Sequence, residues 1–341
     1  MTVPGANRDP SSSALLSVLI LNYNGGPFLR PCLDSLRAQT LAEIEVIVID
    51  NASPDGSAEI VAQEYPEVRL LRLEQNLHFC GGNNAGLPLA TGEYVAFLNN
   101  DTLVVPEWAA EIARAFREHP EVGAVACQMV IADQPELLDN AGTEWLSVLL
   151  GHKIGWGQPA ADYAQEKVVF GFCGGACALR REVLEQVGAF DEDFQSHYED
   201  VDLSFRVFLA GWKCRYVPTA RVYHHISATY GHASPLVIHR TTRNADWVVL
   251  KNVPWQVLLK RGPAMALHRL YGLVHWSLRG GGLARLRGHL AAWGKLGKMW
   301  RKRQEIQRGT RVGWREIEAG TTKKYIPDSL AASRWARRFR R

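Results

Sequence analysis

The sequence has few cysteines and no long apolar run, and each shortage excludes a class of protein. Its six cysteines stand mostly inside apolar segments without paired spacing. This pattern excludes a zinc site, which needs further ligands at comparable spacing, and predicts reduced thiols in the core of a cytoplasmic protein. The N-terminal residues are polar and lack the charged start and apolar stretch of a signal peptide, so we expect none. The most apolar C-terminal stretch, residues 263–278, is interrupted by charged and histidine side chains and is shorter than the roughly 20 apolar residues that cross a bilayer.

Two glycine-rich signatures of nucleotide binding are also missing. The segment Gly81-Gly82-Asn83-Asn84 lacks the Lys-Ser/Thr of a phosphate loop and the spacing of a dinucleotide fingerprint. Two interpretations therefore stay open for it. It begins a helix close to a phosphate group, which makes Gly82 and Asn83 candidate ligand contacts, or it forms a plain tight turn.

Charge is divided unevenly along the chain. Residues 1–239 hold 15 Lys and Arg against 30 Asp and Glu, whereas residues 240–341 hold 24 against 5. Such asymmetry indicates an acidic part that does chemistry and a basic part that meets an anionic partner. The length of 341 residues leaves room for about two domains.

Three short apolar runs in the first third of the chain each end in polar residues. The runs are residues 15–21, 46–49 and 94–98. Unbroken Val, Ile and Leu predict strands buried on both faces of a parallel sheet, and ligands bind at the carboxyl ends of such strands. The polar residues that follow are Asn22, Tyr23, Asn24, Asp50, Asn51, Asn99, Asn100 and Asp101. Their composition suits a nucleotide and a hard cation better than an apolar ligand.

Strand and helix patterns alternate from residue 15 onward. We therefore predict an α/β fold with a mostly parallel nucleotide-binding sheet flanked by helices, followed by a basic helical extension. The expected division is a flexible N-terminus over residues 1–14, a catalytic domain over 15–235 and the extension over 236–341.

Seven motifs follow one another along the chain: SVLILNYN (17–24), VIDNASPDGS (48–57), residues 76–86, FLNND (97–101), GGACALRR (174–181), GAFDEDF (188–194) and EDVDL (199–203) with Arg206. In this order they resemble the motifs of family 2 glycosyltransferases, and most closely those of the rhamnosyltransferase-like branch. The resemblance covers residues 15–230 and implies a GT-A fold. It also implies transfer of a sugar, with rhamnose favoured, from a dTDP- or UDP-linked donor to a hydroxyl of a lipid-linked or polysaccharide acceptor.

The resemblance assigns the donor site to the first three strand ends. Asp101 becomes the ligand of a divalent cation, Mg²⁺ or Mn²⁺, although the family's Asp-x-Asp motif is here Asn99-Asn100-Asp101, with one carboxylate replaced by an amide. Asp50 becomes a contact of the nucleotide base, together with Ser53, and its alternative role is an Asx turn. The alternative for Asp101 is a turn-capping Asp.

The acceptor side is assigned to later motifs. Asp200 matches the general base that takes the proton of the acceptor hydroxyl, and with no second carboxylate placed as nucleophile the resemblance implies inversion. Its alternative role is to cap the helix that runs to Leu209. Gly174, Gly175 and Glu199 are the other acceptor candidates. Trp145 is a candidate wall for the acceptor sugar, or else a core residue.

A histidine after the last strand pattern completes the predicted metal site. The resemblance places a histidine here over the donor, and neutral imidazole is a competent metal ligand. His224 aligns better than His225. The alternative is a histidine on a surface loop.

The basic extension carries no catalytic constellation. Apolar residues recur at helical spacing among Lys and Arg, and the chain ends in a basic tail, residues 334–341. Basic amphipathic helices suit an anionic membrane surface, so we expect a peripheral protein at the cytosolic face. The alternative is a cap packed on the acidic domain. Nucleic acid is not expected, because no recognition fold accompanies the charge.

Other functions remain weaker interpretations. The main alternative is a non-catalytic module that binds a sugar nucleotide or a glycan. A sugar nucleotidyltransferase lacks support because no triphosphate loop is present, and a processive synthase lacks support because spans and a Gln-x-x-Arg-Trp motif are missing.

Overall fold

The computed structural model describes residues 14–226 and 234–323. The predicted flexible N-terminus, up to residue 13, and the basic tail 334–341 lie outside the described residues. Thirteen strands and eleven α-helices are described, and the strands form one ten-stranded sheet and one three-stranded sheet.

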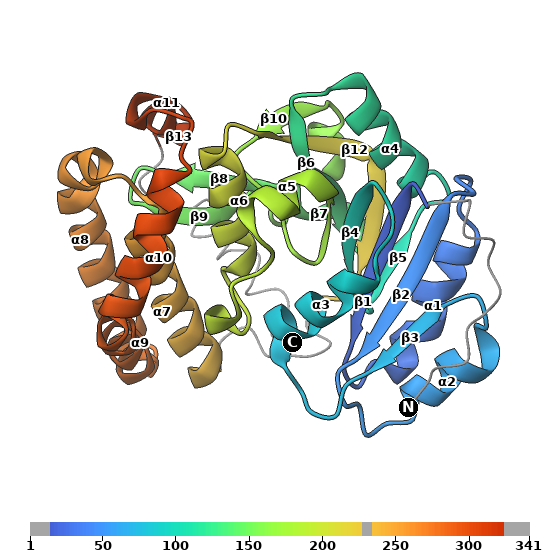
Figure 1. The fold of residues 1–341 in the computed structure, drawn as a ribbon. Coiled ribbons are helices and arrows are strands. Elements are labelled where there is room, and N and C mark those ends of the chain that lie inside the picture. The colour runs from blue at the N-terminus through green and yellow to red at the C-terminus, as the bar shows by residue number, and fades with distance from the viewer. Residues whose placement is uncertain (1–13, 227–233, 324–341) are drawn as a thin grey trace.

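The first four strands form the parallel half of the large sheet (Figure 1). They are β1 (Leu16–Asn22), β2 (Ile44–Asp50), β3 (Arg69–Arg72) and β4 (Tyr94–Asn99), in the order β4-β1-β2-β3. The register pairs Asn22 with Asp50 and Leu21 with Asn99. The polar residues that end three of these strands therefore meet at one edge of the sheet, as predicted.

The other half of the large sheet is mixed. It contains β5 (Thr102–Val104), β6 (Val122–Ile131), β7 (Gln134–Asn140), β10 (Lys167–Val169), β11 (Ala176–Arg180) and β12 (Lys213–His224). β11 lies antiparallel between β4 and β6, while β12 runs parallel to β6. Two neighbouring strands can be parallel only if a crossover, usually a helix, connects them. No α-helix lies between β6 and β11, which fits their antiparallel pairing. The predicted α/β class is confirmed, but the sheet is mixed rather than mostly parallel.

Helices cover both faces of the sheet. They are α1 (Gly26–Arg37), α2 (Ser57–Glu64), α3 (His78–Gly86), α4 (Trp108–Glu118), α5 (Arg181–Val187) and α6 (Glu199–Leu209), with 3₁₀ turns at Leu87–Leu89, Ala160–Tyr163 and Glu192–Phe194. Alternate residues of β1 enter different cores: Leu19 packs in the core shared with α3 and α6, whereas Val18 and Ile20 pack in the core shared with α1 and α4. This two-sided burial explains the unbroken apolar strand sequences.

The described part of the C-terminal region, residues 234–323, forms five helices beside α6 (Figure 1). They are α7 (Pro235–Asn252), α8 (Trp255–Ser277), α9 (Gly282–Gly294), α10 (Leu296–Arg308) and α11 (Trp314–Ala319), followed by β13 (Thr321–Thr322), which joins β8 (Thr143–Leu146) and β9 (Leu150–Lys153) in the small sheet. Among the described residues, no helix is both long and apolar enough to cross a membrane.

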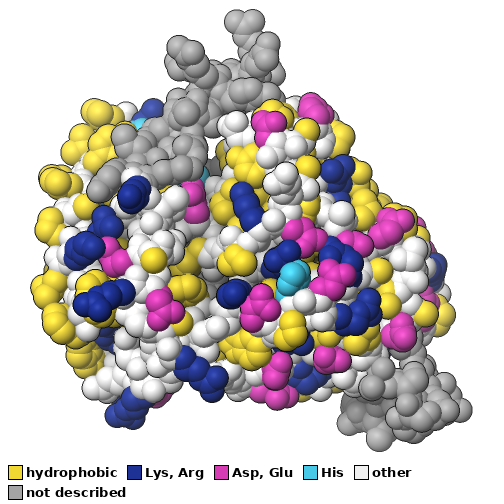
Figure 2. Space-filling view, turned by 90° about the horizontal axis from the view of Figure 1, so that it is seen from above, with side chains coloured by type: hydrophobic (Ala, Val, Ile, Leu, Met, Phe, Trp, Pro, Cys, Tyr) yellow, Lys and Arg dark blue, Asp and Glu magenta, His cyan; other side chains and the backbone are white. Residues whose placement is uncertain are grey.

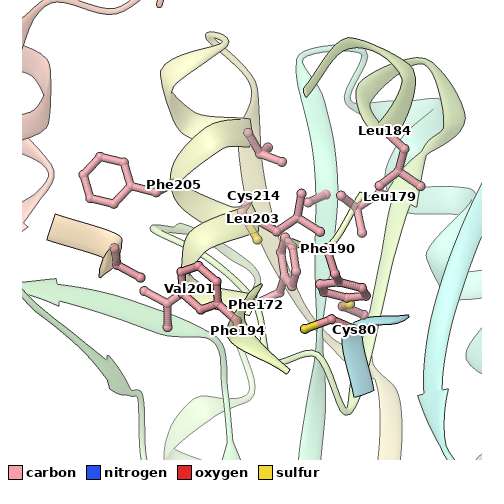
Figure 3. Close-up of a cluster of buried hydrophobic side chains, with 14 of the residues drawn as sticks. Cys80, Phe172, Leu179, Leu184, Phe190, Phe194, Val201, Leu203, Phe205 and Cys214 are labelled. Carbon is pink, nitrogen blue, oxygen red and sulfur yellow. The ribbon is translucent and has the colours of Figure 1, made fainter. Parts of the chain in front are cut away.

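The extension shares a core with the rest of the chain. Trp247, Val248 and Met299 belong to the same buried cluster as Phe194 and Phe205, two of the residues drawn in Figure 3. Buried charge joins the same parts, because Lys251 Nζ lies 2.9 Å from Asp202 Oδ1 and 2.5 Å from Asp191 Oδ2. The extension thus packs as a cap on α6. The boundary predicted at residues 235/236 stays a prediction, and no gap in the apolar core marks it.

Candidate active site

Asn22 ties the ends of the parallel strands together. Its Nδ2 lies within hydrogen-bond distance of Asp50 Oδ1 at 3.0 Å, Ser57 Oγ at 2.7 Å and Ser53 Oγ at 3.1 Å. Its Oδ1 accepts from Asn100 Nδ2 at 2.9 Å. Asn22 is fully buried, so its carboxamide serves this internal network rather than an open ligand surface. Asn22 and Asn100 thus position the strand ends.

The loop after β2 has the predicted Asx geometry. The Ser53 backbone N–H donates to Asp50 Oδ2 at 3.3 Å, and Ser53 Oγ in turn accepts from the Asn24 backbone N–H at 3.1 Å. Asp50 is only 5% exposed, whereas Tyr23 and Ser53 are half-buried and Asn24 is exposed. The turn fixes the Asp50 carboxylate, whereas Tyr23, Asn24 and Ser53 present accessible groups at this edge.

The glycine segment lies inside α3 rather than at its start. The helix begins at His78, and a Cβ on Gly82 would lie 2.3 Å from Leu21 Cδ1. Asn83 is buried, and its Nδ2 donates to the Phe79 carbonyl at 2.9 Å. Gly82 therefore allows close packing of α3 on β1. Both sequence interpretations, a helix start at a phosphate and a tight turn, are wrong for this segment.

Asp101 and His224 face each other beside the strand ends. His224 Nε2 lies 3.5 Å from Asp101 Oδ1, and this buried oxygen has no hydrogen-bond partner among the described residues. The neighbouring His225 ring lies 5.2 Å from the ring of Phe28 and lines the cavity beside Asp101. Of the two histidines, His224 is the one whose ring nitrogen pairs with the Asp101 carboxylate. Asn99 Nδ2 packs toward Gly175, where an added Cβ would lie 3.1 Å from it.

Asp139, which the sequence did not single out, orients His224. Its Oδ2 lies 2.8 Å from His224 Nδ1, and its Oδ1 accepts from Lys153 Nζ at 2.7 Å. Burial opposes the charge on Asp139, but Lys153 and His224 hold the pKa of its carboxyl well below the usual range. Burial alone lowers the pKa of His224, and the carboxylates of Asp101 and Asp139 outweigh it and raise that pKa to about 9.

The Asp101 and His224 pair fits a divalent cation that other ligands complete. The unpartnered Asp101 oxygen and the imidazole nitrogen are both metal-binding atoms, and a carboxylate behind the histidine is a common outer-shell partner. Within residues 14–226 and 234–323, no three His, Cys, Asp or Glu side chains are arranged so that they could hold a metal ion together. Diphosphate oxygens and water would supply the other positions, as is usual for Mg²⁺. A cavity of about 220 Å³ opens beside Asp101 and His225.

Asp200 lies in the first turn of α6, behind a run of left-handed residues. Gln195, His197 and Tyr198 have φ values of 64°, 70° and 68°. Tyr198 is the N-cap, so Asp200 is not the cap that the alternative interpretation proposed. Such backbone is sparsely populated and is often found at functional sites.

Backbone amides orient the Asp200 carboxylate. The Gly174 N–H donates to Asp200 Oδ2 at 3.0 Å, and the Val201 N–H donates to Oδ1 at 2.8 Å. Gly174 also packs closely, since a Cβ there would lie 3.4 Å from Asp200 Cβ. The structure thus brings the predicted residues Gly174 and Asp200 into direct contact.

Glu199 and Asp200 are adjacent carboxyl groups with different surroundings. Burial raises the pKa of Asp200, while the two backbone hydrogen bonds and the charge of Lys153 oppose that rise. Burial and then the Asp200 charge raise the pKa of Glu199 well above its usual range, and Glu199 Oε2 has no partner among the described residues. Pairs separated in this way supply one ionised base and one neutral hydrogen-bond donor.

Asn244 of α7 holds the strained loop in place. Its Nδ2 lies 3.0 Å from the Phe194 carbonyl oxygen, 2.9 Å from that of Ser196 and 2.7 Å from that of His197. Asn244 is fully buried. The extension therefore contributes a residue that sets the position of the loop before Asp200, and no sequence motif indicated it.

Trp145 does not line an open site. It is 1% exposed and packs against Phe170 and Phe205, with ring centroids at 5.7 and 4.9 Å. No face of the indole is left for a sugar ring. The acceptor-wall prediction is therefore wrong, and the core alternative fits.

The fold is of the GT-A type found in glycosyltransferases. The crystal structure of GalNAc-T7 with UDP, GalNAc and Mn²⁺ superposes over 88% of this chain and 55% of its own, with a TM-score of 0.63 at 16% identity. The mannosyltransferase PcManGT from Pyrobaculum calidifontis, in complex with GDP-Man and Mn²⁺, superposes over 88% and 87%, with a TM-score of 0.53 at 18% identity.

The chain belongs to glycosyl transferase family 2, whose profile matches residues 17–188. It is 29% identical to the N-acetylglucosaminyl-diphospho-decaprenol L-rhamnosyltransferase of Mycobacterium tuberculosis, over 86% of this chain and 98% of that protein. It is 31% identical to the O-antigen biosynthesis protein RfbC of Myxococcus xanthus, over 63% of this chain and 17% of that protein. The rhamnosyltransferase-like branch predicted from the motifs is confirmed.

Proposed function

We propose that this glycosyltransferase inverts the anomeric centre while moving a sugar, rhamnose favoured, from a nucleoside-diphosphate donor to a hydroxyl of a lipid-linked acceptor. The observation that carries the proposal is one chain of polar contacts, in which Asp101, His224, Asp139 and Lys153 follow one another. The charge of Lys153 also acts on Asp200. This chain links the candidate donor side to the candidate base.

On the donor side, Asp101 and His224 would hold a divalent cation, Mg²⁺ or Mn²⁺. When bound, the cation supplies positive charge that stabilises the departing diphosphate. Asp139 keeps the His224 ring turned toward Asp101 through the contact at Nδ1. Tyr23, Asn24 and Ser53 are the accessible groups for the nucleotide at the strand ends, beside the Asp50 turn.

On the acceptor side, Asp200 takes the proton of the attacking hydroxyl. Its carboxylate is fixed by the amides of Gly174 and Val201, and its raised pKa makes it a stronger base than an exposed aspartate. Neutral Glu199 can donate a hydrogen bond to an acceptor oxygen. A single base without a nucleophile partner fits one displacement and therefore inversion.

The acceptor class rests on the mycobacterial relative, whose name specifies a diphospho-decaprenol acceptor. An exposed apolar surface on the extension supports it. It forms two stripes, one along α8 and one along α9, which we call the apolar stripes. The first consists of Trp255, Leu259, Leu267, Leu270 and Val274 on α8 with Leu278 at its C-cap, and the second of Leu283, Leu286, Leu290 and Trp293 on α9. Figure 2 shows apolar side chains along the left edge of the molecule, where α8 lies in Figure 1.

Apolar stripes beside basic residues suit the surface of an anionic bilayer. Leu267 and Leu278 are 69% and 83% exposed, and the exposed basic residues Arg279 and Lys295 follow α8 and α9. We therefore propose that the enzyme lies peripherally on the cytosolic face of the membrane, with residues 15–235 as the catalytic domain and 236–341 as the docking extension.

A screen of ligand-induced stability tests the donor assignment. The full chain is heated with sugar nucleotides, including dTDP-rhamnose and UDP-hexoses, with Mg²⁺, with Mn²⁺ or with EDTA. A ligand present at 100 times its dissociation constant stabilises the folded state by about 2.7 kcal/mol, so dTDP-rhamnose with cation should raise Tm by several degrees. Binding without any transfer to a lipid-linked acceptor would instead support the non-catalytic module, and no shift with any sugar nucleotide would refute the proposal.

A further inference from the structure

A second cavity lies between the catalytic part and the extension. It has a volume of about 140 Å³ and is lined by the turn from β8 to β9, by Tyr198, and by residues of α7, α8 and α9. A water molecule occupies about 30 Å³ in the liquid, so this space holds a group of several heavy atoms. Tyr198 immediately precedes Glu199 and Asp200, and its hydroxyl donates to the Gly151 carbonyl at 3.2 Å. The cavity therefore adjoins the proposed acceptor site.

Unpartnered polar atoms converge on this cavity. Thr242 Oγ1, Arg285 Nε and His289 Nε2 are buried without a hydrogen-bond partner among the described residues, and all three residues line the cavity. Buried polar groups are nearly always hydrogen-bonded, so three exceptions in one place indicate a missing partner. Thr242 and Arg285 present donors, and His289 Nε2 is a donor in the imidazolium form.

The charge of the cavity is positive. Asp246 is its only carboxylate among the described lining residues, and it already accepts from Arg269 at 2.6 Å and pairs with His289 Nδ1 at 2.6 Å. Arg285 forms no ion pair with a described residue, and burial lowers the pKa of its guanidinium. The carboxylate of Asp246 acts on this guanidinium but is shared with Arg269 and His289, so the buried positive charge is incompletely balanced and an anionic ligand would relieve its cost.

Gly272 of α8 brings the guanidinium close to the helix backbone. A Cβ at Gly272 would lie 2.5 Å from Arg285 Nη2. The sequence neighbours of the cavity residues are exposed instead. Leu267 and Leu270 stand on either side of His268 and Arg269 in the sequence, and Leu286 follows Arg285. The same two helices thus carry cationic groups inward and the apolar stripes outward.

We propose that this cavity binds the diphosphate group of a lipid-linked acceptor, with the lipid chain lying along the apolar stripes. This inference rests on the proposed function and specifies its acceptor. A diphosphate provides acceptor oxygens for Arg285 and Thr242 and the negative charge that the cavity lacks. The sugar attached to that diphosphate would then lie on the Tyr198 side, toward Asp200.

The test measures binding of simple diphosphates to the full chain by calorimetry. EDTA is present, so that the cation-dependent donor site does not contribute. The probes are farnesyl diphosphate, farnesol and inorganic pyrophosphate. We expect farnesyl diphosphate to bind most tightly, pyrophosphate more weakly and farnesol weakest. Arg285→Gln should weaken binding of farnesyl diphosphate by about tenfold or more, because a charge-assisted hydrogen bond is lost.

Arg287→Gln is the matched control, since it removes the same charge from an exposed position of the same helix. It should leave the affinity within about twofold. Thr242→Val gives a second readout. Because the Thr242 hydroxyl is buried without a partner, its removal should leave Tm unchanged or higher while the affinity for farnesyl diphosphate falls. A purely structural role of Thr242 would not produce this combination.

Three results would overturn the inference. The first is no binding of farnesyl diphosphate to the parent chain, and the second is equal affinity of Arg285→Gln and Arg287→Gln for it. Equal affinity for pyrophosphate and farnesyl diphosphate would exclude a lipid acceptor and leave a site for free phosphate. Binding of a nucleoside diphosphate with Mn²⁺ is measured in parallel; if that binding is missing while farnesyl diphosphate binds, the donor assignment fails and this inference stands.

Discussion

The adjacent histidines His224 and His225 allow a direct test of the proposed metal site, because the His224 ring pairs with Asp101 and the His225 ring packs on Phe28. In the proposed site, His224 contacts Asp101 and Asp139, whereas the His225 ring packs on Phe28. We therefore expect His224→Ala to lose cation-stimulated binding of a nucleoside diphosphate, and His225→Ala to retain it.

Asp139→Asn should weaken the cation response by roughly 10- to 100-fold, since outer-shell partners of metal-binding histidines contribute that much. Calorimetric titration of the nucleotide with and without Mn²⁺ checks all three variants. An equal cation response in His224→Ala and His225→Ala would remove His224 from the site.

Glu199 makes a prediction about stability. Burial and the Asp200 charge raise its pKa in the folded state, so the folded state prefers the protonated form. The stability from this group is present below the unfolded pKa of about 4.3 and is lost as pH rises toward the folded pKa. Glu199→Gln has no such loss.

The variant should therefore gain stability relative to the parent between pH 5 and pH 8, as measured by urea denaturation at both values. The matched exposed variant Glu93→Gln should show no such trend. A constant difference across this range would show that Glu199 ionises normally.

At the scale of elements, α7 controls the loop before α6 through Asn244. Its amide nitrogen lies within hydrogen-bond distance of the carbonyl oxygens of Phe194, Ser196 and His197. These residues lie just before and within the left-handed segment that ends at Tyr198. Asn244→Ala leaves buried carbonyls unpaired, which costs about 1–3 kcal/mol of stability. It should also lower kcat by about tenfold or more, because small displacements of a catalytic group are costly.

Asn252→Ala is the control on the same helix. Asn252 is equally buried, and its Nδ2 donates to the Asp202 side chain on α6 at 2.8 Å rather than to a loop carbonyl. It should lower stability while kcat stays within about threefold. Equal kcat values for the two variants at matched stability would show that Asn244 has only a structural role.

The strands and the polar clusters at their ends were predictable because apolar runs and turn residues are local signals. The direction of β11 was not, since it depends on the path of the chain between β7 and β11. Asp139 and Asn244 were missed for a similar reason: Asp139 meets His224 at a separation of 85 residues, and Asn244 meets His197 at 47. The start of α3 was misplaced because Gly82 allows close contact with Leu21, which no local pattern reveals.

At the scale of the whole molecule, the basic extension is a cap and also carries an exposed apolar surface. It acts as a cap because Trp247 and Met299 pack in the core shared with the N-terminal part of the chain, and Lys251 pairs with Asp191 and Asp202. The two roles that the sequence left open are therefore compatible, since the buried and exposed faces of the helices differ. Because the core is shared, removal of the extension would disturb folding, and tests of membrane binding need the full chain.

Leu267→Glu with Leu278→Glu should abolish co-sedimentation with anionic vesicles. Burying one leucine side chain contributes about 1.5–3 kcal/mol, so losing two, with two charges added, weakens binding by at least a hundredfold. Val168→Glu is the control, since Val168 is 54% exposed on β10, outside the apolar stripes. The parent should also release at high salt. Unchanged sedimentation of the double variant would refute docking through α8.

The most direct test of the central claim compares Asp200→Asn with the parent in transfer and in donor binding. Asparagine keeps the shape and the carbonyl oxygen but cannot take the proton of the acceptor. We expect transfer to a lipid-linked acceptor to fall at least about a hundredfold, while the Kd of the sugar nucleotide with Mn²⁺ stays within about twofold. Transfer within about tenfold of the parent would contradict the account and leave Asp200 as an acceptor for the amides of Gly174 and Val201.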